Sequence, residues 1–260
     1  DPPGQLVMRH QERREDQEPG HLATRLLVVG SCTSLKRDDG CPHPLSLNDF
    51  RDGDRLRERE AALAAWRRPA GEMYTGRQHT QAVAGIQALR RRFGHEFAKL
   101  TIVSAGYGLL REDAPIVPYD ITFATMSRGD ARAWARHLGV AAAVREACAG
   151  YPLVVFLLGS RYLDAIEPPL AAGAAQRFVF LAPTAEATRL TGPGVTVVPA
   201  GAPEATAYSE GLVALKGKMF RLFALGLACS DGALLEDVLR DDTPASFVRA
   251  MRLGLEGSPR

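Results

Sequence analysis

The chain has 260 residues, of which 46% are hydrophobic and 24% are charged, and this is the composition of an ordinary globular protein. A formal net charge of +2 favours no particular partner, so binding to nucleic acid or to a membrane surface requires a local patch. Four scattered cysteines are too few for a disulfide scaffold, and no apolar run reaches the roughly 18 residues of a membrane-spanning helix. We therefore expect a soluble, cytoplasmic protein with no membrane partner.

The composition changes near the N-terminal end. Residues 1–22 are charged, rich in Gln and nearly free of large apolar side chains, so we expect a flexible arm there. Residues 23–260 contain the apolar runs of a core, and we predict that they form a single domain. Its final part, from about residue 230 onward, is predicted to be two short helices.

Five apolar runs rich in β-branched residues are predicted to be strands: 26–30, 101–106, 153–160, 177–183 and 195–201. Their apolar residues are continuous rather than alternating, which indicates burial on both faces and hence a parallel sheet covered by helices. Between these runs, residues 77–93 and 130–148 place apolar side chains at helical spacing. The sequence therefore predicts an α/β fold with a mostly parallel central sheet flanked by helices.

Three of the predicted strands end in small polar residues. Gly30 and Ser31 end the first, Ser104 to Gly108 the second, and Gly159 with Ser160 the third. Ligands of open α/β sheets bind beyond the carboxyl ends of the strands, and glycines let an anion approach the backbone. We expect the three loops to line one cleft for an anion or a sugar; the alternative is that they only form tight turns. The glycine spacing matches neither a Walker nor a Rossmann fingerprint, so no cofactor is implied.

The segment GEMYTGRQ, residues 71–78, is a second group of polar side chains. Thr75 can cap the helix that follows. Glu72, Tyr74 and Gln78 can present a carboxylate, a phenol and an amide toward one point. A surface turn with a half-buried tyrosine explains the same segment equally well.

Several motifs occur in an order that is typical of one known family. They are VVGSCTSLK with Lys36, MYTGRQ, SAGYGLLR, PYD, GSRYLDAIEP and LKGKMFR, and together they cover about residues 26–225. On these motifs the chain resembles the YaaA family of peroxide-stress proteins, also called UPF0246 or DUF328, and related uncharacterised domains of phage and actinobacterial genomes. The resemblance implies a compact α/β fold with a central sheet and, from the best-known members, DNA binding and protection against oxidative damage. Residues 38–70 are an insertion relative to that family.

SAGYGLLR and PYD (118–120) are the most recognisable part of the resemblance, which places them at a strand end facing the same cleft as MYTG. Gly106 and Gly108 allow the backbone to bend beside a ligand. Tyr107 or Tyr119 offers a stacking face, and Arg111 offers a fork for a phosphate or a carboxylate. We interpret this loop as the rim of a site; packing alone is the alternative explanation for the tyrosines.

The preferred hypothesis is a protein that binds a nucleotide, nucleoside or base in the strand-end cleft and performs N-glycosidic or ribosyl chemistry. Such a reaction needs a carboxylate to stabilise an oxocarbenium-like centre or to act as the nucleophile. Asp120, held rigidly by the two residues before it, is the first catalytic candidate, and Glu72 is the second. Glu112 and Asp113 are also near the expected cleft.

The alternative hypothesis is a non-catalytic DNA-binding protein that protects against stress. Residues 51–92 contain ten arginines against five acidic residues, including the triplet Arg90, Arg91 and Arg92. A phosphate-binding stripe has this composition. A solvated helix face, or a helix C-terminus whose dipole the triplet complements, has it as well.

No metal site is expected. Cys32, Cys41 and His43 can supply three zinc ligands, but their spacing and the missing fourth ligand favour ordinary loop residues. The expected partners are a nucleotide or nucleoside, or DNA or RNA.

Overall fold

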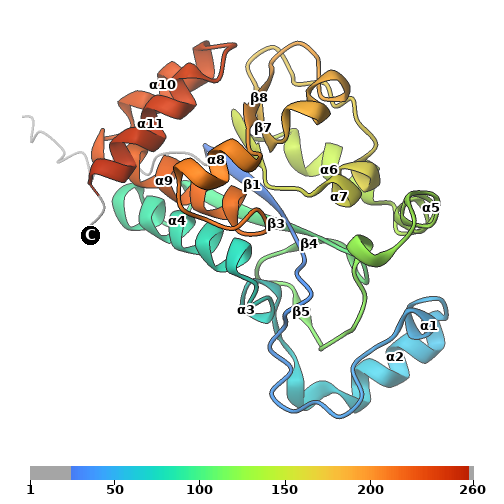
Figure 1. Cartoon of the computed structure of the whole chain (residues 1–260). Helices are drawn as coiled ribbons and strands as arrows, with labels where there is room; N and C mark the ends of the chain where they lie inside the picture. The colour runs from blue at the N-terminus through green and yellow to red at the C-terminus, as the bar shows by residue number, and fades with distance from the viewer. Residues whose placement is uncertain (1–24, 258–260) are drawn as a thin grey trace, which may run out of the picture.

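Residues 25–257 are described by a computed structural model, shown in Figure 1. The arm expected at residues 1–22 lies outside the described residues. Figure 1 shows a central sheet with helices on both sides. A smaller lobe, which contains α1 (Leu47–Phe50) and α2 (Gly53–Ala62), projects from one end.

The central sheet of the described chain has six strands. They are β1 (Leu26–Ser31), β3 (Ala98–Ser104), β4 (Gly108–Arg111), β6 (Leu153–Phe156), β7 (Arg177–Ala182) and β8 (Val195–Pro199). Their order is β4-β3-β1-β6-β7-β8, and every pair is parallel except β3 with β4. All residues of β1, in the middle, are buried, as its continuous apolar run predicts. The expected α/β fold with a mostly parallel sheet is confirmed.

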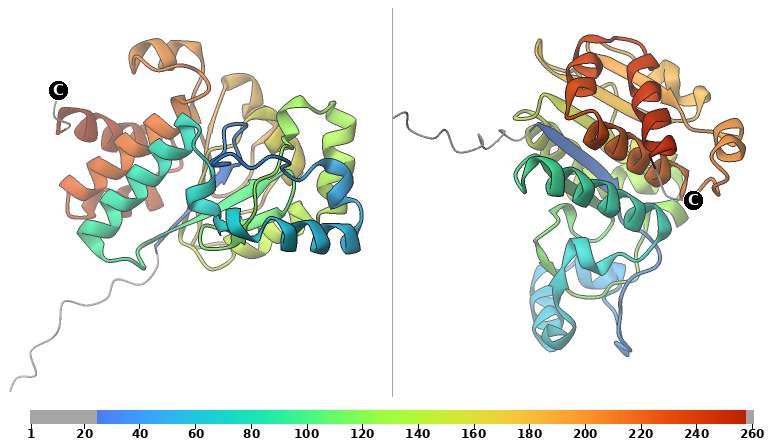
Figure 2. Two further views of the ribbon diagram at one scale, coloured as in Figure 1. Left: turned by 90° about the horizontal axis from the view of Figure 1, so that it is seen from below. Right: turned by 90° about the vertical axis from the view of Figure 1, so that its left-hand side faces the viewer.

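Helices cover both faces of the sheet (Figure 2). On one face lie α4 (Arg77–Phe93), α9 (Leu215–Cys229) and α11 (Ala245–Glu256), and on the other α5 (Arg128–His137), α6 (Val140–Cys148) and α7 (Ser160–Ile166). The shorter elements are α3 (Ala70–Met73), α8 (Ala202–Ala207), α10 (Ala233–Arg240), η1 (Ala64–Trp66), η2 (Phe123–Thr125) and η3 (Thr184–Arg189). Within residues 25–257, no helix has both the length and the apolar character needed to cross a membrane.

One predicted helix is wrong in its extent. The stretch 130–148 forms two helices, α5 and α6, rather than one. Gly139 between them has a φ of 66°, a left-handed conformation that ends a helix. The two helices expected from about residue 230 are α10 and α11.

The insertion at residues 38–70 packs onto the loop that follows β3. Its last strand, β2 (Arg68–Pro69), pairs antiparallel with β5 (Pro115–Ile116). The N–H of Leu45 donates to the carbonyl of Pro118 at 3.0 Å, and the carbonyl of Leu45 accepts from the N–H of Asp120 at 2.8 Å. These contacts fix the insertion over residues 104–120.

The backbones of α9 and α11 are in direct contact. A Cβ atom on Gly226 of α9 would overlap the carbonyl oxygen of Ala250 in α11. Close-packed interiors leave no room for such an atom, so glycine at this position sets the separation of the two helices. This packing anchors the C-terminal end of α9.

Gly226→Ala is expected to lower the free energy of unfolding by about 1–3 kcal/mol, because the added methyl group forces α11 away from α9. Urea denaturation of the purified chain measures this change. Gly150→Ala is the matched control, since a Cβ atom there has no neighbour within 4 Å. Equal stability of the two variants would contradict the close helix contact.

Candidate functional site

A pocket of 980 Å³, which we call the strand-end pocket, lies at the carboxyl ends of β1 and β6. Ser31 is the last residue of β1, and Gly159 with Ser160 leads from β6 into α7; all three line the pocket. Gly30 lies inside β1. The lining residues fall in five segments: 31–35, 76–78, 122–125, 159–162 and 210–216. Two of the three loops expected to share a cleft therefore do so.

Three helices begin at this pocket: it is lined by the first residues of α4 and α7, and by the N-cap Ala214 and the second residue, Lys216, of α9. Their N-cap residues, Gly76, Gly159 and Ala214, make no side-chain hydrogen bond to the helix. The N–H groups of a first helical turn have no partner within the helix, and the helix dipole adds partial positive charge there. The longer two of these helices, α4 and α9, therefore direct partial positive charge toward the pocket.

Lys216, in the first turn of α9, adds a buried positive charge. It is 8% exposed, and its ammonium group donates to the main-chain carbonyl of Leu158. Burial lowers the pKa of Lys216 to about 8, although the charge of Glu186 opposes this effect. The side chain is therefore largely cationic at neutral pH and loses its charge at only slightly higher pH.

Among the described residues that line the pocket, Glu210 has the one carboxylate. Its Oε2 accepts hydrogen bonds from Arg77 at 3.0 and 3.1 Å, and its Oε1 accepts from the N–H of Gly211 at 3.0 Å. Neither Glu210 nor Lys216 was singled out by the sequence. Lys216 lies in LKGKMFR, one of the motifs on which the resemblance rests, so the sequence could have pointed to it. Glu210 lies in a loop without such a motif, and no sequence pattern pointed to it.

Buried hydroxyl groups beside the pocket hydrogen-bond to one another. The hydroxyl of Tyr119 lies 2.7 Å from that of Tyr74 and 2.8 Å from Oγ of Ser104, and the hydroxyl of Tyr162 lies 3.0 Å from Sγ of Cys32. Burial raises the pKa of all three tyrosines, so they are neutral. Tyr74 and Tyr119, predicted to bind a ligand, are each 2% exposed. In the described chain the two side chains are packed and hydrogen-bonded to each other, and their role in ligand binding stays a prediction.

The loop SAGYG packs under the insertion and does not reach the strand-end pocket. Ser104 is fully buried, and its Oγ accepts from the N–H groups of Gly106 and Tyr107 at 3.1 and 3.0 Å. A Cβ atom on Gly106 would lie 2.7 Å from the ring of Phe50, so this glycine makes room for Phe50 rather than for a ligand. The hydroxyl of Tyr107 donates to Glu60 of α2 at 2.9 Å. The loop is therefore packed beneath the insertion, and its interpretation as the rim of a site stays a prediction.

Of the other residues predicted to bind a ligand, Gln78 lines the pocket, whereas Lys36, Thr75 and Gly108 do not. The amide of Gln78 donates to the carbonyl of Leu157 at 2.9 Å. The ammonium group of Lys36 lies 4.4 Å from the centre of the Tyr119 ring. Thr75 is exposed, and the N-cap of α4 is the next residue instead. Gly108 begins the antiparallel strand β4. Across residues 25–257, no three His, Cys, Asp or Glu side chains gather as metal ligands.

The two predicted catalytic carboxylates lie apart from each other. Asp120 is exposed and is not part of the pocket lining. It lies near Lys36: burial lowers the pKa of Lys36, and the charges of Cys32 and Asp120 partly oppose that effect. Glu72 lines a second pocket, of 610 Å³. The structure therefore does not bring Asp120 and Glu72 to one site.

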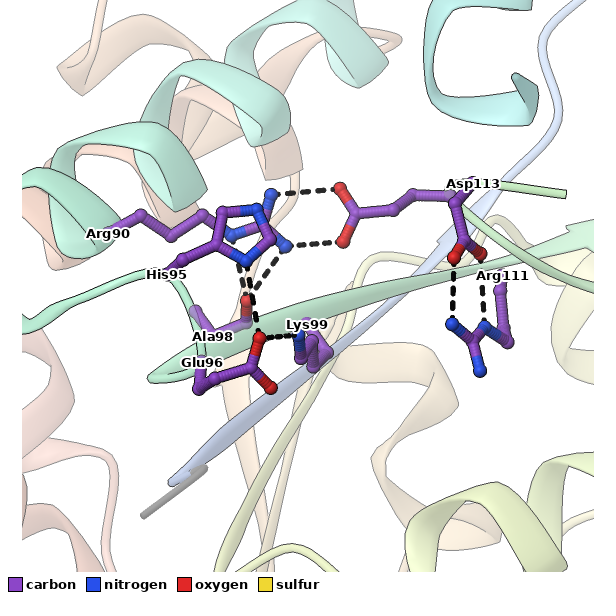
Figure 3. Close-up of polar contacts among 8 residues, drawn as sticks. Arg90, His95, Glu96, Ala98, Lys99, Arg111 and Asp113 are labelled. Atoms are coloured by element: carbon purple, nitrogen blue, oxygen red, sulfur yellow. Dashed lines mark hydrogen bonds and ion pairs between the residues drawn. The ribbon is translucent and has the colours of Figure 1, made fainter. Parts of the chain in front are cut away.

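The second pocket contains charged side chains that are already paired (Figure 3). Arg90 of α4 donates to both carboxylate oxygens of Glu112 and to the carbonyl of Ala98. Arg111 pairs with Asp113 at 2.7 Å. Arg111 is thus paired with Asp113. It does not line the strand-end pocket, contrary to its predicted position at the shared cleft.

Most arginines of residues 51–92 are paired as well. The ion pairs are Arg55–Asp49, Arg57–Asp54, Arg59–Asp49, Arg68–Asp39, Arg77–Glu210, Arg90–Glu112 and Arg92–Asp231. Most of these carboxylates come from outside the segment, so the local excess of positive charge seen in the sequence is largely compensated in the fold. A phosphate-binding stripe would need that charge to be free.

Lys216 is expected to make stability depend on pH. Its pKa is about 8 in the folded chain and about 10.5 when unfolded, so between these values the unfolded state binds more protons and stability rises with pH. Relative to Lys216→Met, the free energy of unfolding of the wild type should therefore rise on the order of 2 kcal/mol from pH 7 to 9.5.

Urea denaturation at the two pH values measures this difference. Lys218→Met, two residues along the same helix, is the control and should change in parallel with the wild type. If the free energy of unfolding of the wild type changed with pH as that of Lys216→Met does, Lys216 would titrate as an exposed lysine does.

Residues 63–191, just under half of the chain, match the model of a family described as a family of unknown function, DUF6884. No curated protein matches the chain. The match includes α4, β3, β6 and α7 but neither β1 nor α9, so two of the five segments that line the strand-end pocket lie outside it. The resemblance to the YaaA family stays a prediction.

Proposed function

We propose that the strand-end pocket binds a nucleotide or nucleoside. The observation that carries this proposal is that one pocket combines an apolar mouth with a positive interior. Leu35, Leu212 and Val213 line it and are 64%, 60% and 87% exposed. Large apolar side chains that gather at a surface mark a binding site. A base suits this mouth, and phosphate or sugar oxygens suit the helix N-termini and Lys216.

The size of the pocket supports a ligand of this class. Its volume of 980 Å³ lies at the upper end of the range of about 300–1,000 Å³ that small-molecule sites occupy. The pocket also opens between segments from distant parts of the chain, as ligand sites of open α/β sheets do.

The chemistry that suits the pocket is cleavage or transfer at an N-glycosidic bond, with Glu210 in the role that the sequence suggested for Asp120. The bond between the sugar carbon and the base nitrogen breaks, the base leaves with the electron pair, and an acceptor such as water attacks the sugar carbon. Arg77 and the N–H of Gly211 hold the carboxylate of Glu210 in place. A carboxylate fixed in this way stabilises the positive charge that develops on the sugar.

The alternative, a non-catalytic DNA-binding protein that protects against oxidative damage, is supported by the resemblance to the YaaA family. Its other support was the basic composition of residues 51–92. Because most of those arginines form ion pairs within the fold, we favour the small ligand.

A thermal-shift screen of nucleosides, nucleotides, free bases and short oligonucleotides tests the proposed function. We expect at least one nucleoside or nucleotide to raise the melting temperature, because a ligand that binds only the folded state stabilises it. Leu212→Asp should abolish this rise, since it places a charge at the apolar mouth. Leu255→Asp is the matched control, because Leu255 is 48% exposed on α11 and does not line the pocket. Stabilisation by oligonucleotides alone would favour the alternative.

Glu210→Gln is expected to reduce turnover of the nucleoside substrate by about 10²-fold or more, because it removes the negative charge while keeping the size of the side chain. Release of free base, followed by chromatography, measures turnover. Asp120→Asn is the matched comparison and should retain activity, since Asp120 lies outside the pocket. The reverse result, with Asp120→Asn inactive and Glu210→Gln active, would return the catalytic role to Asp120.

A further inference from the structure

A buried carboxylate surrounded by arginines lies beside the strand-end pocket. Asp164 of α7 has a side chain that is 0% exposed, and it lies within ion-pair distance of four guanidinium groups. They belong to Arg128 and Arg132 of α5, Arg161 of α7 and Arg189 of η3, at 3.1, 3.3, 3.7 and 2.7 Å. We call these four residues the arginine cluster.

The arginine cluster has more positive charge than its carboxylates compensate. Glu186 also pairs with Arg189, at 3.1 Å, so four guanidinium groups share two carboxylates and the net charge is +2. Burial raises the pKa of Asp164, but the hydrogen bond from Arg189 and the charges of the arginines outweigh burial and keep this pKa below its ordinary value. Asp164 is therefore ionised at neutral pH. One arginine is enough to neutralise it, so packing alone does not account for four.

The outer sides of the cluster are accessible to a ligand. The side chains of Arg128, Arg132 and Arg161 are 55%, 45% and 36% exposed. Each guanidinium group has five N–H donors in a planar fork, and the two oxygens of Asp164 can accept only a few of them. Such forks bind the oxygens of a phosphate group in pairs.

Arg161 connects the cluster to the strand-end pocket. It lines that pocket, and its Nε donates to the carbonyl of Met126 at 3.2 Å, which fixes the guanidinium group. Arg161 therefore belongs both to the lining of the pocket and to the arginine cluster.

We propose that the arginine cluster binds the phosphate groups of the ligand, so that the ligand of the strand-end pocket is a nucleoside diphosphate or a similar nucleotide rather than a nucleoside or a free base. This inference rests on the proposed function, because it assigns the base and the phosphate groups of one ligand to two neighbouring parts of the same site. The base occupies the apolar mouth, and the phosphates extend past Arg161 to the cluster. Asp164 is a positioning residue, since it holds the guanidinium groups together against their mutual repulsion.

Calorimetric titration of the full chain with ADP and with adenosine tests the inference. We expect ADP to bind at least about tenfold more tightly than adenosine, because guanidinium–phosphate hydrogen bonds are the strong, charge-assisted kind. The double variant Arg128→Gln and Arg132→Gln should lose this advantage and keep its affinity for adenosine, since neither residue lines the pocket. Arg161 and Arg189 still pair with Asp164 in this variant. The double variant Arg240→Gln and Arg249→Gln, on α10 and α11, is the control for net charge.

If ADP and adenosine both bind the wild type with equal affinity, the inference is overturned, and an ADP advantage that survives in the double variant would overturn it as well. Titration with inorganic pyrophosphate separates this inference from the proposed function. Pyrophosphate binding that depends on Arg128 and Arg132, without binding of adenosine or ADP, would support the phosphate site and count against the nucleotide pocket. Binding of an oligonucleotide alone would overturn the inference, because the cluster would then contact a polymer backbone.

Discussion

Two consecutive carbonyl groups after β6 hold the candidate site together. The amide of Gln78, in α4, donates to the carbonyl of Leu157 at 2.9 Å, and the ammonium group of Lys216, in α9, donates to that of Leu158. The first turns of two helices are thereby tied to one strand end. The first turns of α4 and α9 approach each other this closely because Gly217 of α9 has no side chain. A Cβ atom there would overlap the carbonyl of Gln78 in α4. This junction places two helix N-termini and a buried lysine beside the strand-end pocket.

The insertion decides which strand ends remain open. It covers the loop after β3 through Leu45, which hydrogen-bonds to residues 118 and 120, and through Phe50, whose ring occupies the space beside Gly106. The ends of β1 and β6 are left to form the pocket. Similar small polar residues thus follow three neighbouring strands with different outcomes. The loop after β3 is packed under the insertion, whereas the loops after β1 and β6 line the strand-end pocket.

The distribution of ion pairs separates structural arginines from candidate ligand-binding ones. In residues 51–92, paired arginines are matched by carboxylates from other parts of the chain, such as Arg90 by Glu112 and Arg92 by Asp231. The arginine cluster has the opposite arrangement, with four guanidinium groups around Asp164. Positive charge that is neutralised inside the fold cannot attract a ligand strongly, whereas an excess that faces solvent can.

The sequence by itself determined the sheet and the main helices, because burial on both faces of a parallel strand leaves a continuous apolar run in the chain. It also indicated that the loops after β1 and β6 line one pocket, since these strand ends carry their own glycines and serines. Only the tertiary structure decided the rest of the candidate site. Glu210 and Arg77 are 133 residues apart, and Tyr119 meets Tyr74 across 45 residues. Local patterns report whether a residue is buried, but they do not report which distant segment buries it.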